Sequence, residues 1–163
     1  MRQEDSKSAI ISPNGCGCLL LLMCIGIIGG IALPSFLNAS NKPMLSEAKQ
    51  YVSSMNKGQH AYFAEKSVFG TSIEALGLGI KTETANYKYS LRATKKTAFN
   101  YGVSKQKELK SYVGGVFIVT YKNEITTTSI LCQADSPGII KPAEPIYQNG
   151  DLICGKGTTQ VTK

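Results

Sequence analysis

The chain has 163 residues, with 18 Lys and Arg against 11 Asp and Glu, and its formal net charge is +7. It has a single histidine, His60, so no second histidine is present to complete a metal site. The spacing of its residues also supports no Ser/His/Asp triad. The composition therefore argues against an enzyme and predicts no cofactor. Its lysines are scattered, and the basic charge indicates either a solvated surface or an acidic partner, with nucleic acid as a weakly supported candidate.

An uncharged run of 22 residues covers positions 16–37. Roughly 20 helical residues cross a bilayer core, and no charge in the run opposes insertion. We therefore predict a cytoplasmic leader over 1–15, a transmembrane helix over 16–37 and one ectodomain over 38–163. A cleaved secretory signal is the competing interpretation, although its apolar region is about 7 to 15 residues long. Anchoring implies a single-pass inner-membrane protein, with lipid as a partner and the ectodomain periplasmic or extracellular.

Small residues recur at spacings of three and four within the apolar run. Such residues let helices approach closely in lipid, so they predict a helix assembly face. Pro34 removes an amide donor and predicts a kink near residues 30–34. The face comprises Gly26, Gly29, Gly30 and Pro34.

The next segment, 44–66, has the pattern of an amphipathic helix that packs on a sheet. Its apolar stripe contains Ala48, Val52 and Met55, whereas Glu47 falls outside the stripe. Residues 72–79 predict a short helical turn that glycine ends.

The period then changes to two, which predicts antiparallel strands with one wet face. The predicted strands cover residues 87–93, 99–104, 112–121 and 126–132, with a hairpin turn at 122–124. The proline-rich remainder predicts an irregular tail.

Cysteine usage separates the two parts of the chain. Cys132 and Cys154 are the only cysteines of the ectodomain, and a lone pair predicts one disulfide in an oxidising compartment, with two free thiols as the alternative. A further three cysteines lie in the apolar run, where they are read as small apolar residues. The step from Gly15 to Cys16 also leaves acylation open as an alternative.

The apolar stretch over 27–37 resembles the N-terminal helix of type IV pilins and type II secretion pseudopilins. The segments Ser46–Val52, Leu76–Ile80 and Asn86–Ser90 are similar to the cyanobacterial type IV pilin-like group called the G and H type. The resemblance implies an α+β pilin-like fold, in which a long hydrophobic N-terminal helix packs on a four-stranded antiparallel sheet. It also implies that the partners are other pilin or pseudopilin subunits and the assembly machinery. The implied function is that of a minor pilin or pseudopilin, a structural subunit in pilus or secretion-filament assembly.

The N-terminal region departs from that family at its processing site. Counted back from Pro34 at the family's spacing, the first mature residue is Pro13, and Gly17 occupies the position of the family's glutamate. The nearest glycine junction is Gly15–Cys16, which we take as the candidate processing site. A permanently anchored accessory or surface-binding protein that does not polymerise is therefore the alternative function.

Overall fold

The computed structural model describes residues 44–161. The predicted leader, the transmembrane segment, the assembly face of Gly26, Gly29, Gly30 and Pro34, and the junction between Gly15 and Cys16 lie outside these residues. Within residues 44–161, no helix is long and apolar enough to cross a bilayer.

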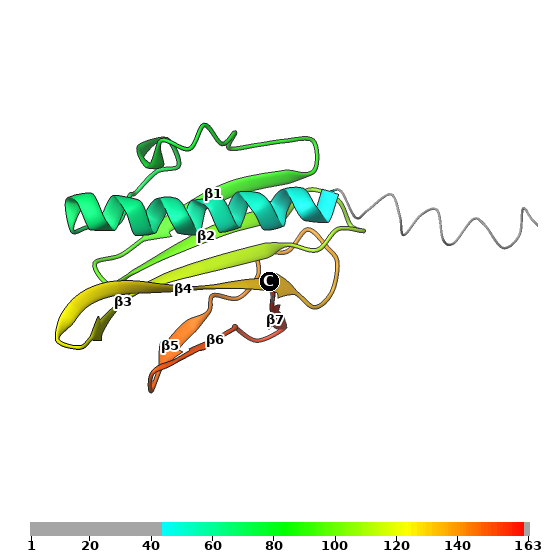
Figure 1. Cartoon of the computed structure of the whole chain (residues 1–163). Coiled ribbons are helices and arrows are strands. Elements are labelled where there is room, and N and C mark those ends of the chain that lie inside the picture. Colours follow the sequence, from blue (N-terminus) through cyan, green and yellow to red (C-terminus); the bar gives the residue numbers. More distant parts are fainter. Residues whose placement is uncertain (1–43, 162–163) are drawn as a thin grey trace, which may run out of the picture. The chain divides into compact units, whose positions relative to one another are not determined.

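One long helix, described over residues 44–66, lies along one face of an antiparallel sheet (Figure 1). Ala48, Val52 and Met55 are completely buried on the sheet side, while Lys49 and Lys57 are exposed. The predicted amphipathic helix is thus confirmed. The chain then turns through Ser67, whose φ is 58° and whose N–H donates to the carbonyl of Phe63 at 2.8 Å.

The sheet has five strands in the order β1-β2-β3-β4-β7, and all neighbouring pairs are antiparallel. The prediction of four strands is wrong, because the end of the tail returns as β7 and pairs with the last three residues of β4. β7 is too short and polar to show a strand pattern in the sequence. The strands are β1 (Tyr87–Ala93), β2 (Thr97–Ser104), β3 (Tyr112–Tyr121), β4 (Glu124–Ala134) and β7 (Thr158–Gln160).

The register of β1 and β2 turns their apolar residues to opposite faces of the sheet. Tyr89 pairs with Gly102, and a side chain on Gly102 would meet Val52 of the helix at 3.0 Å. Gly102 therefore faces the helix, and Phe99 and Tyr101 face away from it. The prediction of one wet face is confirmed for β1, whose Lys88, Ser90 and Arg92 are exposed, but it is wrong for β2, which is buried on both faces.

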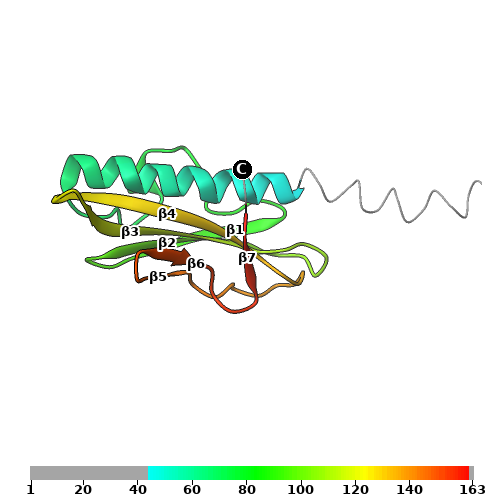
Figure 2. The same ribbon diagram turned by 60° about the horizontal axis from the view of Figure 1, so that its bottom comes forward.

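The C-terminal tail forms a third layer on the face opposite the helix (Figure 2). It contains a two-stranded ribbon of β5 (Ile146–Gln148) and β6 (Asp151–Ile153). Leu152 and Cys154 pack against a cluster that includes Phe117. A disulfide joins Cys154 to the buried Cys132 of β4, with 5.9 Å between their Cα atoms, which confirms the predicted bridge.

Two predicted turns are also confirmed. The 3-10 helix η1 (Glu74–Leu76) ends at Gly77, whose φ is 64°. The hairpin between β3 and β4 has positive φ at both central residues, 49° at Lys122 and 66° at Asn123, as two-residue type I′ turns require.

Replacing both Cys132 and Cys154 with alanine should lower the free energy of unfolding by about 3 kcal/mol, because the bridge restricts the unfolded chain and holds the tail on the sheet. Urea unfolding of the two proteins measures the difference. The wild-type protein under reducing conditions is the control and should match the variant. A loss below about 1 kcal/mol would show that apolar packing alone holds the tail.

Candidate functional site

A buried polar contact fixes the centre of the helix on the sheet. Asn56 on the helix donates to the carbonyl of Ile130 at 3.0 Å and accepts from Asn100 of β2 at 2.8 Å. Both asparagines are at most 5% exposed. Gly114 of β3 makes room for this contact, because a Cβ there would lie 2.1 Å from Oδ1 of Asn56.

A second polar contact holds the segment that follows the helix. The amide of Gln59 donates to the carbonyl of Gly70 and accepts from its N–H, each at 2.9 Å. The Gln59 side chain is completely buried, so this reciprocal pair gives the amide nitrogen and oxygen each a partner at a dry position. The position of the chain entering η1 therefore depends on the helix.

Glu47 anchors the start of the described helix to β1 and its preceding loop. Its carboxylate accepts from the hydroxyls of Tyr89 at 2.9 Å and Thr84 at 2.7 Å, and from the amide of Asn86 at 3.4 Å. Burial, followed by the hydrogen bond to Glu47, raises the pKa of Tyr89 well above its ordinary value. Glu47 lies beside the buried stripe and is half-buried, and no pattern in the sequence signals its contacts because these partners lie about 40 residues further on.

Glu144 ties the tail layer to the sheet. Its carboxylate accepts from the guanidinium of Arg92 at 2.5 Å and from the hydroxyl of Tyr101. Burial and this contact with Glu144 raise the pKa of Tyr101 to about 12. Burial alone would raise the pKa of Glu144, but the hydrogen bonds from Tyr101 and Arg92 outweigh it and hold the pKa below its ordinary value.

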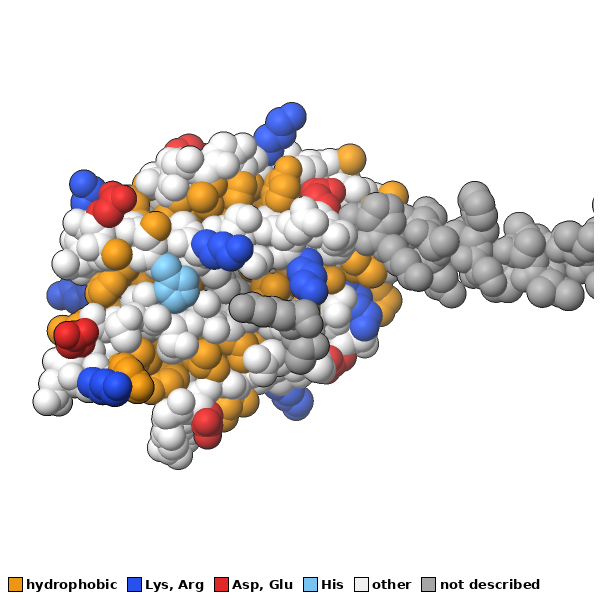
Figure 3. All heavy atoms as spheres, in the orientation of Figure 1, with side chains coloured by type: hydrophobic (Ala, Val, Ile, Leu, Met, Phe, Trp, Pro, Cys, Tyr) orange, Lys and Arg blue, Asp and Glu red, His pale blue; other side chains and the backbone are white. Residues whose placement is uncertain are grey.

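A groove runs between the helix and β4. His60 lines both of its cavities, and its Nδ1 lies 2.6 Å from the Thr127 hydroxyl. Burial lowers the pKa of His60. Figure 3 shows this face with the histidine in pale blue, basic side chains in blue beside it and hydrophobic side chains in orange around it.

The scattered lysines do not form one basic surface in the described part of the chain. Lys95 and Lys96 lie in the turn between β1 and β2, whereas Lys105 begins the loop between β2 and β3, at the other end of these antiparallel strands. Lys105 is also paired with Glu83 at 2.5 Å. The described residues therefore do not support a nucleic-acid surface.

Nothing in the described part of the chain gathers three or more metal-ligating side chains of the His, Cys, Asp or Glu type. Sequence reasoning identified the disulfide but missed the contacts of Glu47, Asn56 and Glu144. Each joins elements that lie 37 to 74 residues apart. No local pattern marks such a pairing, and only the isolated polar positions on an otherwise apolar face could have signalled it.

A protein-family model described as type IV pilin-like G and H matches residues 46–155. The match begins in the long helix and extends through the sheet to the residue after the disulfide. No curated protein and no solved structure matches the chain.

Substituting Asn56 with leucine should lower the free energy of unfolding by about 1–3 kcal/mol, because the buried amide of Asn100 loses its acceptor. Adding Asn100→Leu to the Asn56→Leu variant should lower the free energy of unfolding by less than Asn100→Leu does in the wild type. The reason is that the second substitution removes the amide that the first left unpaired. Chemical denaturation of the wild type, both single variants and the double variant measures this coupling, which we expect to be about 1 kcal/mol. Additive losses would contradict a direct interaction between the two side chains.

Glu144→Gln should make stability less dependent on pH in the acid range. The folded-state pKa of Glu144 is lowered, so its carboxylate stabilises the protein above the unfolded-state pKa of about 4.3 and loses this effect as pH falls through the folded-state value. The gap in unfolding free energy between wild type and variant should therefore shrink from about pH 7 to about pH 3. Urea titrations across this range test the expectation, and parallel curves would refute it.

Proposed function

The chain belongs to the type IV pilin-like G and H family, and we propose that it acts as a membrane-anchored minor subunit in pilus or secretion-filament assembly. Type IV pilin-like proteins have structural roles, and the chain works through protein contacts. The observation that carries the proposal is the coincidence of the family match over 46–155 with a helix packed on an antiparallel sheet and a tail closed by a disulfide.

Three parts of the chain serve this function in the proposal. Residues 1–15 form a cytoplasmic leader, 16–37 cross the inner membrane, and 38–163 form the pilin-like ectodomain outside the cytoplasm. Support for the membrane segment comes from its 22 uncharged residues. The bridge between Cys132 and Cys154 supports an oxidising compartment for the ectodomain, because disulfides persist there and are rare in the cytoplasm.

In the filament, the apolar segments of neighbouring subunits would pack through Gly26, Gly29, Gly30 and Pro34, where small residues permit close approach of helices. The sheet domains would then lie outside this bundle. The packing of the described helix is compatible with such an arrangement, because its apolar side chains are covered by its own sheet while Lys49 and Lys57 remain exposed.

A second function, that of a permanently anchored accessory protein, is favoured by one specific observation. Gly17 stands where the family carries a glutamate that pairs with a neighbour's amino terminus. An amine left unpaired in an apolar core is costly. Such a subunit would remain in the membrane with its ectodomain exposed and would not enter a filament.

Intact mass and N-terminal sequence of the protein from membranes of its native cells distinguish the two functions. Filament assembly predicts a mature chain that starts at Cys16 and is recovered with sheared filaments. A Gly15→Leu variant, which blocks the junction, serves as the matched control and should retain Met1 and disappear from the filament fraction. A wild-type protein that keeps Met1 and stays in the membrane would instead establish the accessory role.

A further inference from the structure

β4 carries an open edge over most of its length. It has eleven residues, Glu124–Ala134, of which only Cys132–Ala134 pair with β7. Among residues 44–161, no strand lies beside positions 124–130 on that side. At about 3.3 Å per residue, this leaves an edge of roughly 23 Å.

Backbone groups along this edge alternate in direction. The N–H of Val161 donates to the carbonyl of Leu131 at 2.9 Å, so Leu131 points its backbone groups away from β3. In an antiparallel ladder, the backbone N–H and C=O groups of every second residue point toward the same neighbouring strand. Ile125, Thr127 and Ser129 therefore also direct their N–H and C=O groups outward, where an added strand would find them.

The opposite edge of the sheet, β1, is protected. Its residue Tyr89 donates from its backbone to Thr82 at 2.8 Å, and Thr84 donates to the carbonyl of Tyr87 at 2.9 Å. Lys88 and Arg92 add charge along this strand. Positions 125–130 of β4 have no charge, proline or glycine, which are the features that natural edge strands use against pairing. Among the described residues, one edge is thus blocked by the chain itself, while the other is open over positions 124–130.

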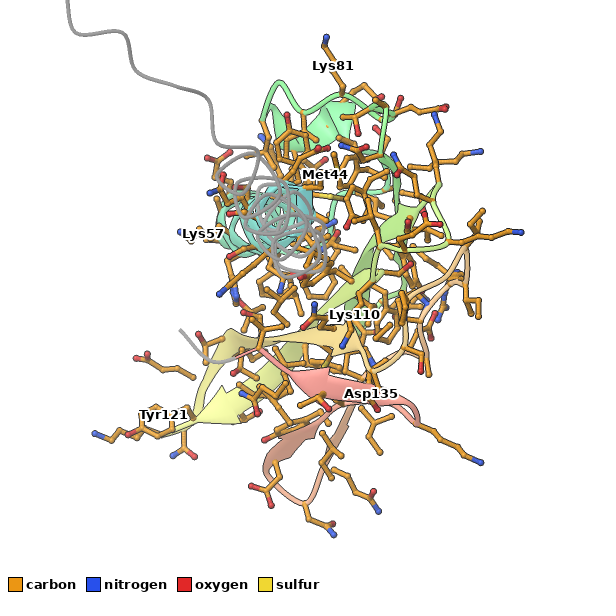
Figure 4. All side chains as sticks on the ribbon, turned by 90° about the vertical axis from the view of Figure 1, so that its right-hand side faces the viewer. Met44, Lys57, Lys81, Lys110, Tyr121 and Asp135 are labelled. Carbon is orange, nitrogen blue, oxygen red and sulfur yellow. A yellow bond between two sulfur atoms is a disulfide. The ribbon has the colours of Figure 1, made fainter. Side chains whose placement is uncertain are left out.

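The groove beside β4 has an apolar end and a basic end. Its two cavities have volumes of about 440 and 520 Å³ and lie on the helix side of the strand. One end is lined by Phe63, Ile118 and Ile125, and the other end by Lys49 and Lys57, with no carboxylate among the lining residues. Figure 4 shows Lys57 projecting outward from the helix and Tyr121 projecting from the tip of the β3–β4 hairpin.

We propose that the edge of β4 binds an extended acidic segment of a partner protein as an added antiparallel strand. Main-chain hydrogen bonds to Ile125, Thr127 and Ser129 would supply the pairing, and the groove would select side chains at alternate positions. Because the added strand runs opposite to β4, its acidic residues come first, near Lys57. Its apolar residues follow four to six positions later, near Ile125.

A second copy of this chain is a poorer occupant. Its net charge of +7 opposes self-association, and the corresponding segment of its own β4 has one acidic residue, Glu124. An acidic strand, by contrast, complements the lysines at the end of the groove. This inference is independent of filament assembly, since it requires only the described domain surface.

A designed peptide tests the proposal on the full chain in detergent. The peptide Glu-Thr-Glu-Thr-Val-Thr-Ile-Thr-amide, whose N-terminal amine is acylated by the fluorophore, places both glutamates and both apolar residues on the groove side. A matched peptide has lysine at the two glutamate positions. Fluorescence anisotropy with labelled peptides should show the acidic peptide binding at least about tenfold more tightly than the basic one. Equal binding of the two peptides would overturn the acidic character of the partner.

Thr127→Pro isolates the strand-pairing contribution. It removes an outward N–H that makes no bond to β3, a position where edge strands tolerate proline. Thr127→Val is the matched control, because it keeps the amide and also loses the hydroxyl beside His60. Relative to the valine variant, the proline variant should bind the acidic peptide at least about tenfold more weakly, with both variants matching the wild type in circular dichroism.

Two further results would overturn the proposal. One is equal affinity of the proline and valine variants, which would show that no strand is added at this edge. The other is a concentration-dependent dimer in sedimentation that Thr127→Pro abolishes, since the occupant would then be a second copy. A Lys57→Gln variant should weaken binding of the acidic peptide about threefold, and unchanged binding would argue against the assigned direction of the strand.

Discussion

The contact between Asn56 and Asn100 is the constraint on which the rest of this domain depends. It places two polar side chains between the helix and the sheet, where an unpaired amide is costly, so the helix has one favourable position. Asn100 must then face the helix, and the alternation of β2 turns Phe99 and Tyr101 to the other side. That second apolar face needs a cover, which the tail supplies.

Each cover is fastened by interactions between distant parts of the chain. On the helix side, Glu47 and Gln59 hold the loops that precede β1 and η1. On the tail side, the disulfide of Cys154 and the carboxylate of Glu144 hold the ribbon against the sheet. The domain therefore consists of three layers, and its outer surfaces are left for contacts with other molecules. A structural role of the type IV pilin-like kind requires such surfaces.

The edges of the sheet differ in what they leave available. β1 is shielded by the chain that leads into it, while β4 extends beyond the short β7 and lies beside a groove with lysines at one end. The two proposals use different parts of the chain: the apolar N-terminal segment for the proposed assembly, and the edge of β4 for the proposed binding of an acidic strand. The proposed assembly relies on apolar packing between helices, whereas the proposed strand binding relies on backbone hydrogen bonds.

The sequence by itself determined the amphipathic helix, four of the strands, the β3–β4 turn and the pairing of Cys132 with Cys154. These features follow from local periodicity, from the polar Lys122–Glu124 break between two β-prone runs, and from Cys132 and Cys154 being the only two cysteines after residue 37. Only the tertiary structure decided the fifth strand, the burial of both faces of β2 and the open edge of β4. Register and strand order depend on contacts between residues far apart in the chain, and such contacts leave no periodic signal in a single sequence.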